Sequence, residues 1–250
     1  MAKRNVLLSH SLTTAGSVSG EAPQLIHVLL DGEGPYGDPY YVDSANNGPY
    51  GAALTQELIP YLEAQLRAVG RPEGRFVDGG STGGWISLAL QVFYPDFFNG
   101  AWSYCADAVD FHHFQLVDIY ADDNAYTNTH GYERPSMRTT EGEPVFSIRE
   151  EIQLERVLGR GDTYASSGGQ WGACNAVYSL RGQNGRPLEI CYPATGALDR
   201  EVTEAFARSV REGTPLVAAA EEGLGSVTLA NGILMSHFTG KPVDVPIDGD

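Results

Sequence analysis

The stretch VDGGSTGGW, residues 77–85, places four glycines around one serine and one threonine. It follows a short apolar run and precedes a longer one, which predicts a turn between a strand and a helix. Gly79, Ser81 and Gly83 match G-x-S-x-G, the pattern of a sharp turn that presents a nucleophilic serine. Side chains two residues before and two after that serine would collide across the turn, and glycine occupies both positions. The stretch therefore predicts a Ser81 nucleophile, with the Thr82 backbone N–H placed to stabilise an oxyanion.

The glycines in this part of the chain have three other interpretations. A Walker A loop needs Lys and then Ser or Thr after its second glycine, but Trp85 and Ile86 follow Gly84. The segment GEGPYG, residues 32–37, matches G-x-G-x-x-G, but a long loop follows it instead of a helix, and Glu33 would place a carboxylate against the phosphates. In the third interpretation the glycines merely let a helix and a strand pack closely. The spacing favours the nucleophile.

Apolar runs along the first half of the chain alternate between strand and helix patterns. This alternation predicts an α/β fold with a mostly parallel sheet and helices on both faces. The strands are expected at residues 5–10, 24–32, 75–80 and 99–106, and the helices at residues 52–70, where Gly70 supplies the stop, and 82–95.

Residues 107–195 break this alternation with acidic and glycine-rich segments, and we expect them to form an irregular insertion or lid with a helix near 147–158. A helix is expected at 197–213, with two late strands after it, of which the second has the weaker pattern. The whole chain, residues 1–250, is predicted to be one domain.

Composition limits the classes of partner. The formal net charge of −16 disfavours nucleic acids and anionic membranes. The three cysteines include no C-x-x-C pair, and no apolar segment approaches the ~18 residues of a membrane span. The apolar part of the N-terminus is too short for a signal peptide, so we expect a cytoplasmic protein, or a secreted one if the N-terminus is truncated.

A family resemblance covers roughly residues 24–205. It rests on the segments GGSTGGW (79–85), LALQVFYPDFFNGAWSYCADAVDF (88–111) and IYADDNAY (119–126). In these segments the chain resembles the putative esterase family of α/β-hydrolases, which includes esterase D and feruloyl-esterase-like enzymes. The resemblance implies an α/β-hydrolase-like fold, a carboxylic ester as substrate and no cofactor.

The resemblance also implies roles for individual residues. Ser81 would be the nucleophile, the Thr82 N–H one oxyanion donor, and the backbone of Gly32 or Glu33 the second donor. The family's late acid and histidine segments are not recognisable after residue 205, and the start looks short. The chain is therefore expected to be a shortened or fragmentary member, and the completeness of its triad stays open.

A serine hydroxyl needs a base, usually histidine, to take its proton. His237 follows a late strand-like run and is the preferred candidate, with Glu221 or Glu222 to orient it in the chain order Ser, Glu, His. An ordinary exposed histidine is the alternative interpretation of His237.

The other histidines give weaker signals. Adjacent His112 and His113, near three aspartates that include Asp107, raise the alternative of a metal-dependent carbohydrate enzyme. No i, i+4 histidine pair supports it, and no metal is expected. His10 and His27 are expected to pack in or beside strands, and His130 lies in the insertion.

Aromatic side chains near the predicted site complete the candidates. Tyr36, Tyr40 and Trp85 are predicted to line the substrate site, although loop packing explains the tyrosines equally well and a core position explains Trp85. Overall the sequence predicts a serine esterase that acts on a small-molecule or carbohydrate-linked ester. The rival interpretation is a non-catalytic or truncated relative that binds a glycan or a protein partner.

Overall fold

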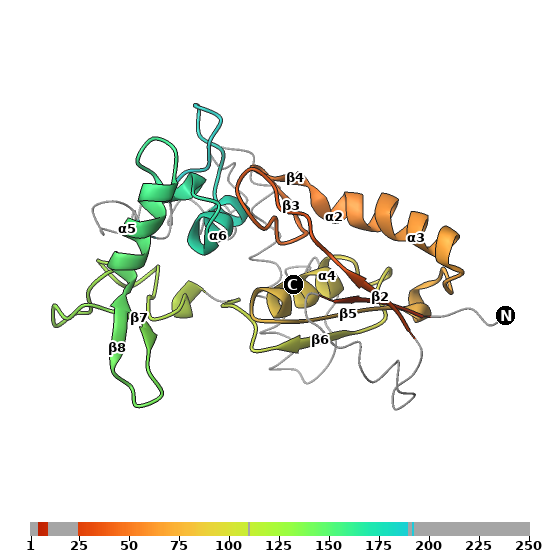
Figure 1. Cartoon of the computed structure of the whole chain (residues 1–250), viewed down its shortest axis with the longest axis horizontal. Helices are drawn as coiled ribbons and strands as arrows, with labels where there is room; N and C mark the ends of the chain where they lie inside the picture. The colour runs from red at the N-terminus through yellow and green to blue at the C-terminus, as the bar shows by residue number, and fades with distance from the viewer. Residues whose placement is uncertain (1–4, 10–24, 110, 190–191, 193–250) are drawn as a thin grey trace, which may run out of the picture.

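The computed structural model describes residues 5–9, 25–109, 111–189 and 192 (Figure 1). The described part is an α/β structure: a parallel sheet with its helices, followed by a part that holds a hairpin and two helices. The helix and strands predicted after residue 195 lie outside the described residues.

Four strands form the sheet in the order β2-β1-β5-β6, and every neighbouring pair is parallel. Each strand lies where the sequence predicts one: β1 (Asn5–Ser9), β2 (Leu25–Leu29), β5 (Arg75–Gly80) and β6 (Ala101–Tyr104). Because β1 pairs with both β2 and β5, the loops that follow β2 and β5 leave the same end of the sheet. The wider prediction, a mostly parallel sheet with helices on both faces, concerns the whole chain and stays a prediction.

The helix expected at residues 52–70 is one continuous helical stretch with a widened middle. It consists of α2 (Tyr50–Ala53), a π-helical segment (Leu54–Leu58) and α3 (Ile59–Leu66). Pro60 lies just after the π-helical segment, and the wider turn accommodates a residue that has no N–H and whose ring crowds the preceding turn. The helix ends at Arg67, which adopts a left-handed conformation (φ 56°), so the predicted stop at Gly70 was three residues too late.

α4 (Thr82–Phe93) follows β5 directly and ends before Pro95, as expected. The buried face of α4 carries Trp85, Ile86, Ala89 and Leu90, which follow the i, i+3, i+4 spacing of a core-facing helix. This helix anchors the turn around Ser81, residues 79–83, to the core. We call this turn the elbow.

The segment expected to be an insertion contains regular structure. The helix predicted near 147–158 is α5 (Ile148–Leu158). Figure 1 shows α5 together with β7 and β8 to one side of the sheet, and α6 between them and the loop that carries β3 and β4. The remaining elements are β3 (Asp43–Ser44), β4 (Gly48–Pro49), β7 (Pro135–Arg138), β8 (Pro144–Ser147), α6 (Gln170–Tyr178) and the 3-10 turns Pro72–Gly74, Phe111–His113 and Tyr164–Ser166.

Side chains from both parts share one apolar cluster. Trp85 and Leu90 of α4 belong to it, as do Ile152 of α5 and Trp171 of α6. The Asn46 amide also ties the β3–β4 loop to the end of α6, with hydrogen bonds to the carbonyls of Ala176 (3.0 Å) and Ser179 (2.8 Å). The division of the whole chain into domains stays a prediction.

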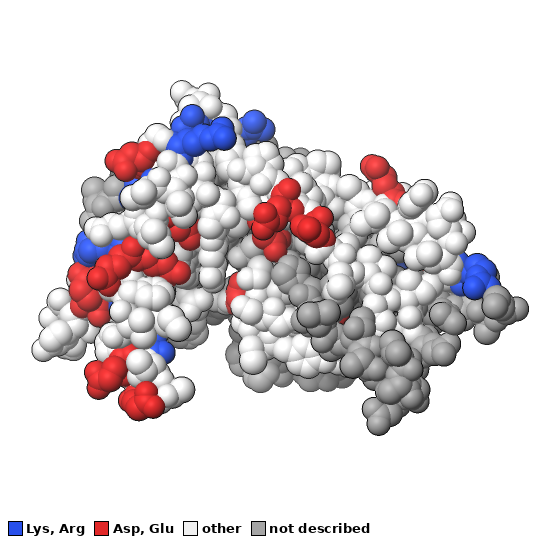
Figure 2. Space-filling model, viewed as in Figure 1, with Lys and Arg blue, Asp and Glu red and all other residues white. Residues whose placement is uncertain are grey.

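Charge is unevenly distributed on the face shown in Figure 2. Acidic side chains gather over the part that holds β7, β8 and α5, and arginines lie beside them. Among the described helices, none combines the length and the apolar character needed to cross a bilayer.

Candidate active site

Ser81 lies at the junction of β5 and α4 in a strained backbone conformation. Its φ of 57° and ψ of −123° fall in a region that non-glycine residues rarely adopt. Hydrogen bonds fix the residue on both sides: its N–H donates to the Tyr104 carbonyl (2.9 Å), and its carbonyl accepts from the N–H groups of Trp85 (3.1 Å) and Asp107 (3.2 Å). The residue is exposed. The turn therefore holds the Ser81 side chain at an exposed position.

Two glycines make this turn possible. A Cβ on Gly79 would lie 2.2 Å from the Gly83 carbonyl oxygen, which is the collision across the turn that the sequence predicts. A Cβ on Gly84 would lie 2.8 Å from the Tyr104 carbonyl oxygen, so this glycine lets α4 approach β6. The close-packing interpretation thus explains Gly84, and the elbow interpretation explains Gly79.

The Asp107 carboxylate binds both hydroxyls of the turn. Ser81 Oγ donates to Asp107 Oδ1 (3.2 Å), and Thr82 Oγ1 donates to Asp107 Oδ2 (2.8 Å). Sequence reasoning missed this role, since it considered Asp107 only as a possible metal ligand. A usable signal was present: Asp107 follows β6, and the carboxyl ends of parallel strands meet at the same edge of a sheet.

Tyr40 joins this group from the loop after β2. Its ring is buried (3% exposed) and packs against Trp85 (centroids 5.4 Å apart) and Tyr178 (6.3 Å). Burial above all, and then the nearby Cys174 and Asp107, raise the pKa of the Tyr40 phenol well above its ordinary value. Tyr40 is therefore a core residue rather than an exposed substrate contact.

The other predicted contact residues lie in different surroundings. Trp85 is 1% exposed, and its ring packs against those of Tyr40 and Tyr178, so it occupies a core position instead of the predicted substrate contact. Tyr36 is partly buried, and its hydroxyl donates to the Gly185 carbonyl (3.4 Å) in the segment after α6. Its contact with substrate stays a prediction.

Gly32 and Glu33 lie in the loop that follows β2, as expected, with Gly32 partly buried and Glu33 exposed. A Cβ on Gly32 would lie 2.9 Å from the Tyr41 hydroxyl, so the ring of Tyr41 covers this glycine. Their roles as oxyanion donors stay predictions.

The predicted base and its orienting acid, His237 and Glu221 or Glu222, lie outside the described residues. Within the described part, His112, His113 and His130 are exposed, and the His112 ring packs against Tyr120 (4.7 Å). In this part of the chain, no three or more His, Cys, Asp or Glu side chains are grouped so that they could hold a metal ion.

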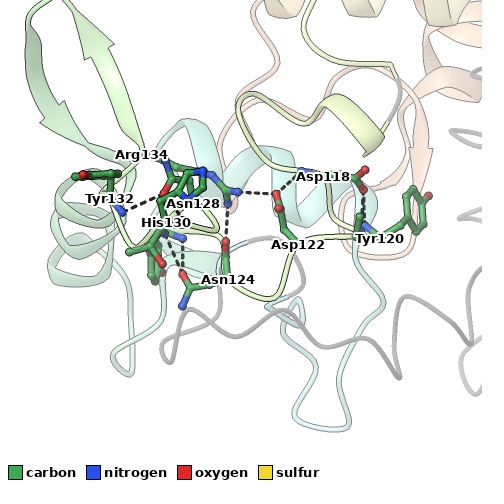
Figure 3. Close-up of polar contacts among 11 residues, drawn as sticks. Asp118, Tyr120, Asp122, Asn124, Asn128, His130, Tyr132 and Arg134 are labelled. Atoms are coloured by element: carbon green, nitrogen blue, oxygen red, sulfur yellow. Dashed lines mark hydrogen bonds and ion pairs between the residues drawn. The ribbon is translucent and has the colours of Figure 1, made fainter.

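Polar contacts hold the segment that contains IYADDNAY, as Figure 3 shows. Arg134 is buried and pairs with Asp122 (2.7 Å), while its second terminal nitrogen donates to the Asn124 carbonyl (2.5 Å). Asp118 Oδ1 accepts from the Tyr120 N–H (2.9 Å). The carboxylates of Asp118 and Asp122 thus serve to fold this segment.

Fold and site together define an α/β protein that presents a serine at a strained strand-to-helix turn. The model of the family described as putative esterase matches residues 19–158, which is more than half of the chain. The chain therefore belongs to the putative esterase family.

Solved structures give partial likenesses. A ferulic acid esterase is 20% identical over 42% of this chain and 46% of that one, with a TM-score of 0.32. The Staphylococcus aureus fluorophosphonate-binding serine hydrolase FphF is 18% identical over 47% and 48%, with a TM-score of 0.36. The Shigella flexneri enterobactin esterase FES is 19% identical over 40% and 28%, with a TM-score of 0.31. The chain matches less than half the length of each of them. The comparison with curated proteins gave no match.

Proposed function

We propose that this protein is a serine esterase of the α/β-hydrolase type that cleaves carboxylic esters through an acyl-enzyme on Ser81. The observation that carries the proposal is the exposed Ser81 at φ 57° in the turn between β5 and α4, in a chain of the putative esterase family. Strain of this kind persists where the surrounding structure enforces it, and it concentrates at functional sites. A small-molecule or carbohydrate-linked ester is the proposed substrate, and the mechanism includes no cofactor.

In the proposed reaction Ser81 Oγ attacks the ester carbonyl carbon while His237 takes the hydroxyl proton. The Thr82 N–H, at the first position of α4, and the N–H of Gly32 or Glu33 stabilise the negative charge that develops on the carbonyl oxygen. The protonated histidine then gives its proton to the departing alcohol. Water, deprotonated by the same histidine, hydrolyses the acyl-enzyme and releases the acid.

Fluorophosphonate labelling tests the nucleophile. The native chain should be labelled, Ser81→Ala should not, and Ser136→Ala, which removes an exposed serine on β7, should be labelled like the native chain. Turnover of p-nitrophenyl acetate should be lost with Ser81→Ala and with His237→Ala. Unchanged labelling of Ser81→Ala would contradict the proposal.

A non-catalytic relative that binds a glycan or a protein partner is the second candidate. It is favoured by one observation: among the described residues, the Ser81 hydroxyl donates to the carboxylate of Asp107 and not to a histidine. A native chain that binds glycan but is neither labelled nor hydrolyses p-nitrophenyl acetate would support this candidate over the esterase.

A further inference from the structure

We infer that the Asp107 carboxylate makes Ser81 select neutral and cationic esters over esters that carry a negative charge close to the scissile carbonyl. This inference rests on the proposed function, because it names the class of substrate that the Ser81 nucleophile accepts. Asp107 determines this specificity through its charge, and it is not the base of the proposed reaction.

The Asp107 carboxylate lies directly beside the proposed nucleophile. Its Oδ1 accepts the hydrogen of the Ser81 hydroxyl (3.2 Å), and its Oδ2 accepts that of the Thr82 hydroxyl (2.8 Å). The Asp107 N–H donates to the Ser81 carbonyl (3.2 Å), so the backbone of Asp107 is held against the same turn. Because Ser81 Oγ becomes bonded to the acyl carbon of the substrate, the groups beside the ester bond lie close to this carboxylate during the reaction.

The hydrogen-bond partners of Asp107 do not cancel its charge. Both are hydroxyl groups, which donate a hydrogen but bring no positive charge. Among the residues that the structure describes, no Lys or Arg forms an ion pair with Asp107. The N-terminus of α4, which begins at Thr82, contributes roughly half a positive charge. That partial charge favours a carboxylate at this position and leaves the rest of the negative charge uncompensated.

The segments around Ser81 supply no basic side chain either. Residues 5–66 and 76–133 contain no Lys and no Arg, and they include the four strands of the sheet and the loops after β2, β5 and β6. The same segments place the exposed carboxylates of Asp31 and Glu33 in the loop after β2, at the end of the sheet where Ser81 lies. A substrate that approaches Ser81 past these loops therefore meets a negative field.

A fixed negative charge beside the nucleophile discriminates between substrates by their charge. It raises the energy of a bound anionic ester and lowers the energy of a cationic one. Asp107 is partly buried, so dissolved salt screens its charge less than it screens that of an exposed side chain. The proposed carbohydrate-linked esters are uncharged and satisfy this selection, whereas an ester with a carboxylate or phosphate near the carbonyl does not.

Three acetates of similar size test the selection: 3-acetoxybenzoate, 3-acetoxybenzamide and 3-acetoxy-N,N,N-trimethylanilinium. All three give the same acetyl-enzyme on Ser81, and they differ in the charge of the departing phenol, which is negative, neutral or positive. Two ratios of kcat/KM are measured, that of the anionic acetate to the amide and that of the cationic acetate to the amide. Because the same esters are compared in each variant, their intrinsic reactivities cancel when the ratios of two variants are compared.

Asp107→Asn removes the charge and retains an oxygen that can accept from Ser81, so it separates charge from hydrogen bonding. At low salt it should raise the ratio of the anionic acetate to the amide roughly tenfold, the effect of two unit charges about 7 Å apart near a protein surface. It should lower the ratio of the cationic acetate to the amide by a similar factor. Asp96→Asn makes the same change in net charge at an exposed residue beyond the far end of α4, and both of its ratios should equal those of the native chain.

Salt provides a test that needs no variant. Raising NaCl from about 0.01 M to about 1 M shortens the Debye length from about 30 Å to about 3 Å. Both ratios of the native chain should then move toward those of Asp107→Asn. A role of Asp107 in structure alone would change the rates of all three acetates alike and would leave their ratios unchanged. If Asp107→Asn does not fold, native ratios that do not respond to salt overturn the inference.

Ser81→Ala separates this inference from the proposed function. The expected result is no turnover by Ser81→Ala, shifted ratios in Asp107→Asn and native ratios in Asp96→Asn. If Ser81→Ala hydrolyses none of the acetates while Asp107→Asn keeps the native ratios, the function holds and the inference is overturned. If Ser81→Ala hydrolyses the acetates like the native chain, the proposed function fails, and the inference fails with it.

Discussion

Replacing Gly79 with alanine is the sharpest test of the elbow, because Gly80 beside it provides a matched control. Both glycines lie in β5, and neither needs a positive φ. A Cβ on Gly79 would lie 2.2 Å from the Gly83 carbonyl oxygen and 2.3 Å from its carbon. A Cβ on Gly80 would find its nearest neighbours at 3.8 and 4.0 Å, on Tyr104.

The magnitude follows from these distances. A carbon–oxygen contact normally lies at about 3.3 Å or more, so Gly79→Ala is short by roughly 1 Å. The obstructing atoms belong to the backbone of α4 and cannot rotate away, so the start of the helix must move. Overpacking typically costs about 1–3 kcal/mol, and we expect Gly79→Ala to lie at or beyond the upper end of that range. Gly80→Ala should stay within about 1 kcal/mol of the native chain.

Urea unfolding of the two variants at 25 °C measures this difference. Any effect of alanine on the unfolded chain is shared by the two variants and cancels in the comparison. Fluorophosphonate labelling should also slow about a hundredfold in Gly79→Ala, because a shift of about 1 Å misplaces Ser81. Equal free energies of unfolding and equal labelling rates for the two variants would refute the steric account of the turn.

Three further predictions concern stability. Ser147→Ala should lower the free energy of unfolding by about 1 kcal/mol, because the Ser147 hydroxyl caps the first turn of α5; an unchanged urea midpoint would contradict this. Burial, and then the charge of Asp43, raise the pKa of Tyr94 to about 12, so its contribution to stability is present below about pH 10 and is lost as the pH rises toward about 12. Thermal unfolding should show a flatter alkaline decline in Tyr94→Phe, and an identical decline would argue against it. Arg75→Met should lower the free energy of urea unfolding by about 3–5 kcal/mol, because it leaves the buried Glu63 carboxylate without the arginine that binds it at 2.8 and 2.9 Å. A loss below about 1 kcal/mol would contradict this prediction.

The elements near the elbow were predictable from sequence because their constraints are local. The strand at 75–80, the turn and the helix that ends before Pro95 are each determined by residues close together in the chain. The collision that requires Gly79 involves Gly83, four residues away, so spacing alone was sufficient to predict it.

The partners of Ser81 and Thr82 were not predictable in the same way. Asp107 lies 26 residues after Ser81, and its contact exists because β6 pairs in parallel with β5. Tyr40 precedes Trp85 by an even longer stretch, and their contact depends on how the loop after β2 packs against α4. A composition-based argument sees a tyrosine-rich loop at this point, but which tyrosine turns inward depends on the packing around Trp85.

The aromatic residues expected to line the site instead explain how its strain is maintained. Of the described non-glycine residues with positive φ, Tyr40, Tyr41, Ser81 and Cys105 lie on the three segments that follow β2, β5 and β6. Each such conformation is disfavoured on its own and persists when surrounding contacts over-determine it. The rings of Tyr40 and Trp85 supply such contacts, since they are buried against each other and the Trp85 N–H donates to the Ser81 carbonyl. A substrate contact at Trp85 would require this ring to leave the core, and the turn that presents Ser81 would lose its support.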